Sequence, residues 1–313
     1  MAGPILTVIL NATLDLTYEV DHVDWQGANR VRAVHARAGG KGVNVAQVLQ
    51  QLGWEVAVAG LAGGPTGTLI RQSLAESGLR DLLVEIQVES RRTVVGDADR
   101  RQVALFNEPG PQVWEHEWET FLGGFRPTIT NSAAVVLAGS LPPGVPIDAY
   151  AVLTRAAAEV GVAAVLDADG PALREGLGAS PRLVKPNLSE LTSLIGWSPA
   201  GPKEVLAAAA ELQAAGAQAV VVSLGAPGLV ARTPSGCLQG APPEQVRGNP
   251  TGEGDAAGAR LTAGLITGTP WLELLADASA ISAAAVLAPT AGSYDVTAYR
   301  RIRALRQVQE LRC

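Results

Sequence analysis

The segment from Asn249 to Gly264, NPTGEGDAAGARLTAG, combines residue types that suit phosphoryl transfer. Gly252 and Gly254 stand just before residues that favour a helix, so backbone N–H groups can turn toward one point and hold an anion. Asp255, at the expected helix start, is stabilised as a carboxylate and could accept the proton of a reacting hydroxyl. An aspartate that merely caps the helix is the alternative interpretation of this pattern.

A second glycine cluster, Gly39-Gly40-Lys41-Gly42-Val43-Asn44, also precedes a run that favours a helix. Its glycines permit close approach to the backbone, Lys41 offers a point charge, and Asn44 can donate to and accept from sugar hydroxyls. A tight turn into a helix is the alternative. The cluster lacks the pattern of a Walker A loop, and the glycines at 60–64 have the wrong spacing for a dinucleotide fingerprint.

Further polar residues follow expected strands. Asp15 could bind a pair of hydroxyl groups, or it could cap a turn. Lys185, Asn187 and Glu190 follow another strand, where Asn187 and Glu190 could orient a Mg²⁺-bound water near a triphosphate. A helix N-cap with a capping box from Asn187 to Glu190 explains the same spacing. Ser223 ends a later strand and could line a nucleotide pocket.

The elements that must position these residues alternate between strand and helix along most of the chain. This alternation predicts an α/β fold with a doubly wound, mostly parallel sheet flanked by helices on both faces. Functional loops should then lie at the carboxyl ends of the strands. Strands are expected at 5–10, 56–61, 135–139, 163–167, 183–187 and 219–225, a late hairpin at 228–241, and final helices at 271–288 and 296–311.

Two segments, at about 14–37 and 86–107, depart from this rhythm because both contain only amphipathic strand patterns. We expect them to form one small β-sheet, called the lid below, over the carboxyl edge of the main sheet. Arg91 lies on one lid segment and Arg30 on the other, where they could pair with a substrate phosphate. A solvated strand face is the alternative. Residues 1–313 are expected to form a single domain into which these lid strands are inserted.

Composition limits the classes of partner. The chain is 47% hydrophobic and 17% charged, with 24 Lys and Arg against 30 Asp and Glu, a net charge of −6. Without a basic tract, nucleic acid and membranes are not expected partners, and an anionic substrate would need a local basic pocket. No apolar run approaches the ~18 residues of a membrane span. Cys237 and Cys313 have no metal-site spacing and predict no disulfide framework, so the cytoplasm is the expected location.

Taken together, these stretches resemble the ribokinase-like carbohydrate kinases of the PfkB family over essentially the full length. GGKGVNVAQVLQQLG at 39–53 and the segment 249–264 carry most of the resemblance. Supporting matches are LNATLD at 10–15, AGSLPPGVP at 138–146, LDADG at 166–170, KPNLSEL at 185–191 and VVSLGAPG at 221–228. Lys41, Asn29-Arg30, Ser90-Arg91 and FNEPGP at 106–111 are similar to the branch that phosphorylates ketohexose phosphates.

The resemblance implies ATP- and Mg²⁺-dependent phosphorylation of a sugar hydroxyl. It implies Asp255 as catalytic base and an anion hole formed by Gly252, Glu253 and Gly254. The implied sugar and acceptor-phosphate contacts are Asp15, Gly40, Lys41, Asn44, Arg91, Arg30 and Ser140. The implied nucleotide and magnesium contacts are Lys185, Asn187, Glu190, Ser223, Gly225, Gly228, Gly252 and Gly254, with Asn187 and Glu190 reaching the metal through water.

Three residues depart from the family pattern. Glu253 replaces the usual small alanine before Gly254, where a carboxylate would repel a triphosphate unless it points away or is paired. Ala12 replaces the proline that usually follows Asn11. Thr93 stands where asparagine is usual, which blurs recognition of the acceptor phosphate.

The expected reaction is therefore phosphoryl transfer from ATP to a ketohexose monophosphate, with fructose 1-phosphate as first choice and fructose 6-phosphate or tagatose 6-phosphate as second. A sugar-phosphate or nucleotide sensor impaired by Glu253 is an alternative from another class, and a nucleoside kinase is a third. The family's lid often pairs with another subunit's lid, which implies a homodimer.

Overall fold

The computed structural model describes residues 3–98, 102–242, 246–305 and 307–313. Its main sheet has ten strands in the order β14-β13-β12-β11-β10-β9-β8-β1-β4-β5. From β11 to β5 the neighbouring strands are parallel, whereas β12, β13 and β14 form an antiparallel edge. The strands are β1 (Ile5–Ile9), β4 (Val56–Gly63), β5 (Arg80–Ile86), β8 (Ala134–Ala138), β9 (Ala163–Asp167), β10 (Leu183–Val184), β11 (Val220–Ser223), β12 (Leu229–Thr233), β13 (Gly236–Gly240) and β14 (Val308–Leu311).

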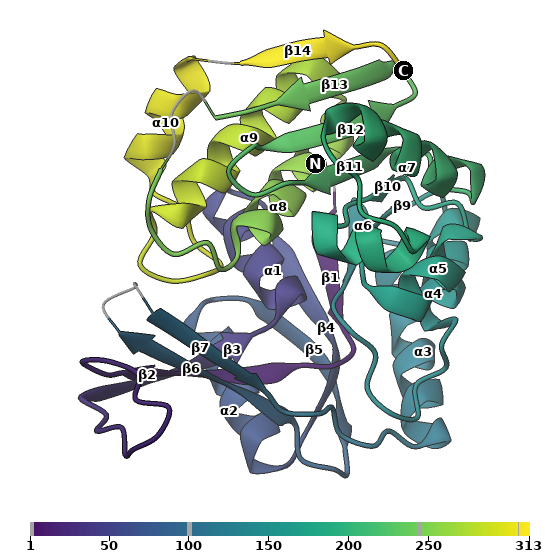
Figure 1. The fold of residues 1–313 in the computed structure, drawn as a ribbon. Helices are drawn as coiled ribbons and strands as arrows, with labels where there is room; N and C mark the ends of the chain where they lie inside the picture. Colours follow the sequence, from purple (N-terminus) through teal and green to yellow (C-terminus); the bar gives the residue numbers. More distant parts are fainter. Residues whose placement is uncertain (1–2, 99–101, 243–245, 306) are drawn as a thin grey trace.

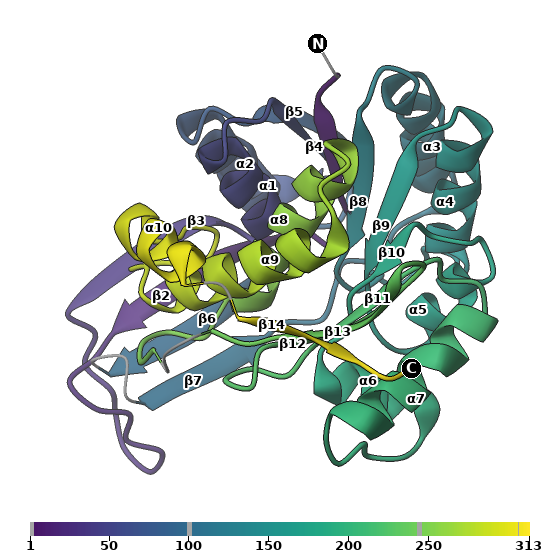
Figure 2. The ribbon, with the colours of Figure 1, turned by 90° about the horizontal axis from the view of Figure 1, so that it is seen from above.

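Helices cover both faces of this sheet (Figures 1 and 2). One face carries α1 (Lys41–Gln51), α2 (Gly64–Glu76), α8 (Glu253–Ile266), α9 (Trp271–Val286) and α10 (Val296–Ala304). The other carries α3 (Glu115–Ile129), α4 (Ala149–Glu159), α5 (Gly170–Leu177), α6 (Leu188–Ile195) and α7 (Pro202–Ala214). Every residue of β1 is buried, because a central parallel strand is covered on both faces. The predicted doubly wound α/β fold is confirmed.

The lid is a separate sheet of four strands in the order β3-β2-β6-β7. Its strands are β2 (Thr13–Glu19), β3 (Ala33–Gly39), β6 (Arg91–Ala98) and β7 (Gln102–Asn107). Asp15 on β2 is paired with Arg37 on β3 and with Thr93 on β6. Directly paired residues present their side chains on the same face, so this row of the lid carries three polar groups side by side.

Three expectations about the elements need correction. The segment 296–311 is not one helix, because α10 ends at Ala304 and residues 308–311 form β14, which pairs with the edge strand β13. The cysteines do form a disulfide, Cys237–Cys313, which joins β13 to the chain just after β14. Residues 80–86 form β5 beside β4, whereas the alternating pattern predicts strand structure only from about residue 83 onward.

The residues Gly96-Asp97-Ala98-Asp99 predict a hairpin turn within the second lid segment, but this stretch lies partly outside the described residues, because residue 99 is not described. None of the helices in the described part of the chain is both long and apolar enough to cross a membrane.

Candidate active site

Asp255 lies in the first turn of α8 with only 8% of its surface exposed. The helix is capped by Gly252, whose φ of 85° is a left-handed conformation that glycine adopts without strain. No side chain caps this helix end; instead Asp255 Oδ2 accepts a hydrogen bond from Asn44 Nδ2 at 2.8 Å. The interpretation of Asp255 as a simple helix cap is therefore wrong.

Burial and, to a lesser extent, the nearby Asp167 carboxylate raise the pKa of Asp255 to about 6, against the opposing influence of Lys185 and Asn44. A carboxylate in this environment binds a proton more readily than one in water. At neutral pH it would still be largely ionised. It therefore has the properties of a general base that works near physiological pH.

Asn44 is positioned by α1, which packs against α8. Its amide oxygen accepts a hydrogen bond from Arg37 Nη2 at 3.4 Å, and Arg37 Nη1 donates to the carbonyl of Ala291. The guanidinium also lies 3.9 Å from Asp15. Burial raises the pKa of Asp15 to about 6, while Arg37 and Arg91 act in the opposite direction. Two partly desolvated carboxylates, Asp15 and Asp255, thus flank Asn44.

A buried ionic cluster lies at the carboxyl ends of β9 and β10. Lys41 Nζ contacts Asp167 Oδ1 at 2.9 Å and Glu190 Oε1 at 2.7 Å, and Lys185 Nζ lies 2.9 Å from Asp167 Oδ2. Burial disfavours the charged form of Lys41, but its two carboxylate partners outweigh this and raise its pKa. Burial likewise opposes ionisation of Asp167, yet the two lysines hold its pKa below the usual value. The cluster presents two fixed ammonium groups.

In the structure Asn187 is the N-cap of α6, which was the alternative interpretation of its spacing to Glu190. Asn187 Oδ1 accepts from the Glu190 amide at 2.8 Å, and Glu190 Oε2 accepts from the Asn187 amide at 2.9 Å, a reciprocal capping box at the start of α6. Because Glu190 Oε1 also holds Lys41, the carboxylate has a second role at the cavity. Its action on a metal-bound water stays a prediction.

The lid supplies the opposite wall. Arg91 Nε donates to the carbonyl of Asn11 at 3.4 Å, which places its guanidinium above the end of β1. Thr93 Oγ1 donates to Asn107 Oδ1 at 3.1 Å, so an asparagine from β7 is present beside the position where Thr93 departs from the family pattern. Asn11 Nδ2 in turn donates to Ser140 Oγ at 3.0 Å.

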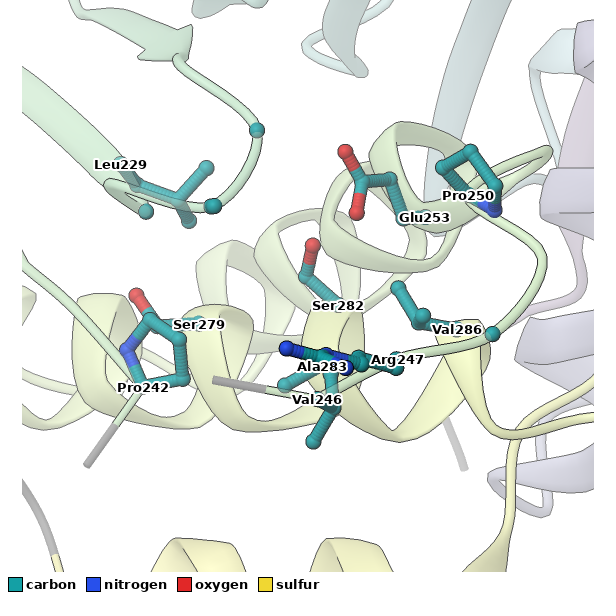
Figure 3. Close-up of a pocket in the computed structure, with 14 residues that line it drawn as sticks. Leu229, Pro242, Val246, Arg247, Pro250, Glu253, Ser279, Ser282, Ala283 and Val286 are labelled. Atoms are coloured by element: carbon teal, nitrogen blue, oxygen red, sulfur yellow. The ribbon is translucent and has the colours of Figure 1, made fainter. Parts of the chain in front are cut away.

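These residues surround one cavity of about 730 Å³. The predicted site residues that line it are Asp15, Gly40, Lys41, Asn44, Arg91, Ser140, Lys185, Asn187, Glu190, Ser223, Gly252, Glu253, Gly254 and Asp255. Gly225 and Gly228 instead line a neighbouring, more apolar cavity of about 380 Å³, shown in Figure 3. Glu253 and Pro250 line both cavities.

The positions of two predicted site residues, Arg30 and Lys41, differ from the expectation. Arg30 lies on the exposed loop between β2 and β3 and is not among the residues that line either cavity. Lys41, expected at the acceptor phosphate, is held between Asp167 and Glu190, beside residues assigned to the nucleotide. Its ammonium is thus positioned between the two groups of predicted contacts.

Asp167 and Arg37 contact other residues of the site and hold them in place, but neither was predicted from the sequence as a site residue. Asp167 lies in the motif LDADG at the end of β9, so its place after a buried strand was the available signal. Arg37 is one of several lid arginines, and nothing in its local sequence distinguishes it. Among the described residues there is no group of three or more His, Cys, Asp or Glu side chains suited to holding a metal ion.

Comparison with solved structures places this geometry among sugar kinases. A structure of phosphofructokinase-2 from Escherichia coli in complex with fructose-6-phosphate is similar, with a TM-score of 0.87 and 28% identity over 97% of this chain and 99% of that one. A possible 1-phosphofructokinase from Thermotoga maritima gives 0.89 and 25% over 98% and 99%. Ribokinase from Arabidopsis thaliana, solved with ribose and ATP, shares the fold with 0.76 and 22% over 97% and 99%.

The family comparison covers most of the sequence. The profile of the pfkB family carbohydrate kinases matches residues 8–297, which include the end of β1, the lid, the ionic cluster and the start of α8. This range contains every predicted site residue. The chain is therefore a sugar kinase that belongs to the pfkB family of carbohydrate kinases.

Proposed function

We propose that this kinase transfers the γ-phosphoryl group of ATP to a hydroxyl of a ketohexose monophosphate, with fructose 1-phosphate as the first candidate acceptor. Fructose 6-phosphate and tagatose 6-phosphate are the second candidates. The observation that carries the proposal is the buried Asp255 carboxylate, held by Asn44 at the start of α8 and lining the larger cavity. A proton acceptor beside the N–H groups of a helix start is the arrangement that phosphoryl transfer to a hydroxyl needs.

The nucleotide fits the junction of the two cavities. The smaller cavity is lined mainly by small and apolar residues, among them Leu229, Val246 and Ala283, which suit a base and its sugar (Figure 3). The phosphates would then extend past Glu253 toward Gly254 and Lys185, into the larger cavity. Mg²⁺ would arrive bound to the triphosphate, where it supplies positive charge between the phosphate oxygens. The carboxylates around this end fit such an ion through its water ligands.

The acceptor is assigned to the lid side. Arg91 supplies a guanidinium suited to bidentate recognition of a phosphate, and Asp15 suits a pair of sugar hydroxyls. Fixing the distant phosphate would hold the reacting hydroxyl in line with the γ-phosphorus, which removes the entropic cost of finding that orientation. Asn44 keeps the Asp255 carboxylate turned toward the cavity.

The transfer step forms one bond and breaks another at the γ-phosphorus. The sugar oxygen forms a bond to that phosphorus, its bond to the leaving oxygen of ADP breaks, and Asp255 takes the hydroxyl proton. The amide groups at the start of α8, with Lys41 and Lys185, stabilise charge on the moving phosphoryl group. No other protein group needs to carry a proton.

A coupled ADP-release assay with each of the three sugar phosphates tests this proposal. With ATP and Mg²⁺ we expect turnover of at least one, and the highest kcat/KM for fructose 1-phosphate. A higher kcat/KM for another of the three would overturn the acceptor assignment but not the reaction. No turnover of any of them would contradict the proposed reaction class. The relatives, at 25% and 28% identity, do not separate these acceptors.

We also propose that two copies associate through their lids. Several large apolar side chains on or near the lid strands are exposed, including Val34, Leu105 and Phe106, each with more than half of its surface accessible. The ring of Trp25, in the loop between β2 and β3, lies 6.2 Å from that of Phe106. An exposed pair of apolar rings such as Trp25 and Phe106 is typical of an association surface. Light scattering should give twice the mass of one chain.

A further inference from the structure

Glu253 has a position unlike that of any other carboxylate at the site. It is the first residue of α8, it is half-buried, and among the described residues it is the one acidic side chain that lines both cavities. Figure 3 shows its carboxylate extending from the helix into the smaller cavity. Within the described ranges its carboxylate has no hydrogen-bond or ion-pair partner, whereas both carboxylate oxygens of Glu190 are engaged.

The charged groups around Glu253 do not neutralise its carboxylate. Five carboxylates line the larger cavity, those of Asp15, Asp169, Glu190, Glu253 and Asp255, against three cations, Lys41, Arg91 and Lys185. Lys185 is the cation whose field acts on Glu253, but its ammonium already contacts Asp167 at 2.9 Å. A site meant for two phosphorylated substrates therefore carries an excess of acidic groups. Positive charge must enter with one of the substrates.

We propose that Glu253 makes the site select the magnesium complex of the nucleotide over the free nucleotide. This inference rests on the proposed function, because it assumes that a nucleotide lies across the junction of the cavities. Free nucleotide would bring its phosphates against an unpaired carboxylate, and like charges this close repel strongly where water is largely excluded. The magnesium complex carries less negative charge, and its ion accepts a carboxylate oxygen directly or through a water ligand.

The selection follows from the combination of the carboxylate with the helix start. The N–H groups at the start of α8 attract a phosphate whether or not it carries a metal. With a small side chain at position 253, these donors would bind free nucleotide as well as its complex. The Glu253 carboxylate repels the phosphates of free nucleotide, and a metal ion bound to the nucleotide cancels this repulsion. Glu253 is therefore a specificity-determining residue for the phosphoryl donor.

The test is a binding measurement that does not depend on turnover. Calorimetric titration of ATP at pH 8, once with EDTA and once with saturating Mg²⁺, gives two Kd values and their ratio for each variant. We expect Glu253→Gln to lower the ratio of the free to the complexed Kd by about tenfold or more, chiefly through tighter binding of free ATP. Glu253→Asp, which keeps the charge, should preserve most of the wild-type ratio.

Glu119→Gln is the matched control, because it removes the same charge from an exposed position on α3, on the other face of the sheet. Its ratio should equal that of the wild type. An unchanged ratio in Glu253→Gln, or an equal fall in Glu119→Gln, would overturn the inference while leaving the proposed function intact. Failure of the wild type to bind ATP in either form would instead overturn the proposed function.

Discussion

At the scale of single residues, the site depends on carboxylates whose environments differ. Burial raises the pKa of Asp255 and of Asp15 to about 6, although Asp15 has an arginine, Arg37, 3.9 Å away. Asp167 is buried equally deeply but lies between two lysines, which hold its pKa low. Asp255 is thus suited to accept a proton, whereas Asp167 is suited to stay charged and hold the lysines in place.

The raised pKa of Asp255 has a consequence for stability. The ordinary pKa of an aspartate is 3.8 and that of Asp255 in the fold is about 6, so the folded state favours the protonated form. The stability this group contributes is fully present below pH 3.8 and is lost as pH rises through 6. Asp255→Asn should therefore unfold less readily than the wild type at pH 8, by about 2 kcal/mol, with a smaller difference at pH 5.

Urea unfolding at the two pH values measures this difference. The control is Asp277→Asn, which weakens contacts of 2.8 Å to Arg260 and 2.7 Å to Arg303 and should lower stability at pH 8. An Asp255→Asn protein that is no more stable than the wild type at pH 8 would contradict the assigned environment. A gain of stability upon loss of an active-site group is the usual trade-off between function and stability.

Residues whose chemistry is visible in local spacing could be predicted from the sequence. Asp255 and Asn44 follow glycines at helix starts, and both line the cavity. Asp167 and Arg37 could not be singled out, because their roles come from partners far along the chain. Lys41 is 126 residues from Asp167, and Ala291 is 254 residues from Arg37. Contacts at such separations depend on the topology of the sheet rather than on any local pattern.

At the scale of elements, the lid and α8 meet the same cavity from opposite sides. The paired row of Asp15 and Thr93 on the lid faces the helix start that carries Asp255. The alternating patterns at 14–37 and 86–107 predicted such a sheet, because amphipathic strands have one face to cover. The short strand β14 could not be predicted, since four residues that continue a helical pattern become a strand only through pairing with β13.

Two adjacent arginines on the lid allow a matched test of its role. Arg91 lines the cavity, whereas the guanidinium of Arg92 contacts Glu89 and Thr66 outside it. Arg91→Ala should raise KM for the sugar phosphate by about tenfold to a hundredfold, as expected for the loss of a charge-assisted contact, with little change in KM for ATP. Arg92→Ala should leave both KM values near those of the wild type.

Steady-state kinetics with each substrate varied in turn provides the measurement. An equal rise in both KM values for Arg91→Ala would indicate general damage to the lid rather than loss of a phosphate contact. An unchanged KM for the sugar phosphate would place that phosphate elsewhere.

At the scale of the whole molecule, the site exists only where distant parts of the chain converge. The carboxyl ends of β1, β8, β9, β10 and β11, the starts of α1 and α8, and the lid all border one cavity. Parallel strands deliver their following loops to the same edge of a sheet, which is why alternating strands and helices predicted the location of the site. The net charge of −6 does not predict that Lys41, Arg91 and Lys185 line the same cavity.

The most direct test of the central claim is the kcat of Asp255→Asn under saturating sugar phosphate and MgATP, with the acceptor that the wild type prefers. The amide is close in shape to the carboxylate and can still accept a hydrogen bond from Asn44, but it cannot take a proton. We expect kcat to fall about 10²–10⁴-fold with the Kd for MgATP nearly unchanged. A variant that keeps more than about a hundredth of the wild-type kcat would contradict Asp255 as the base.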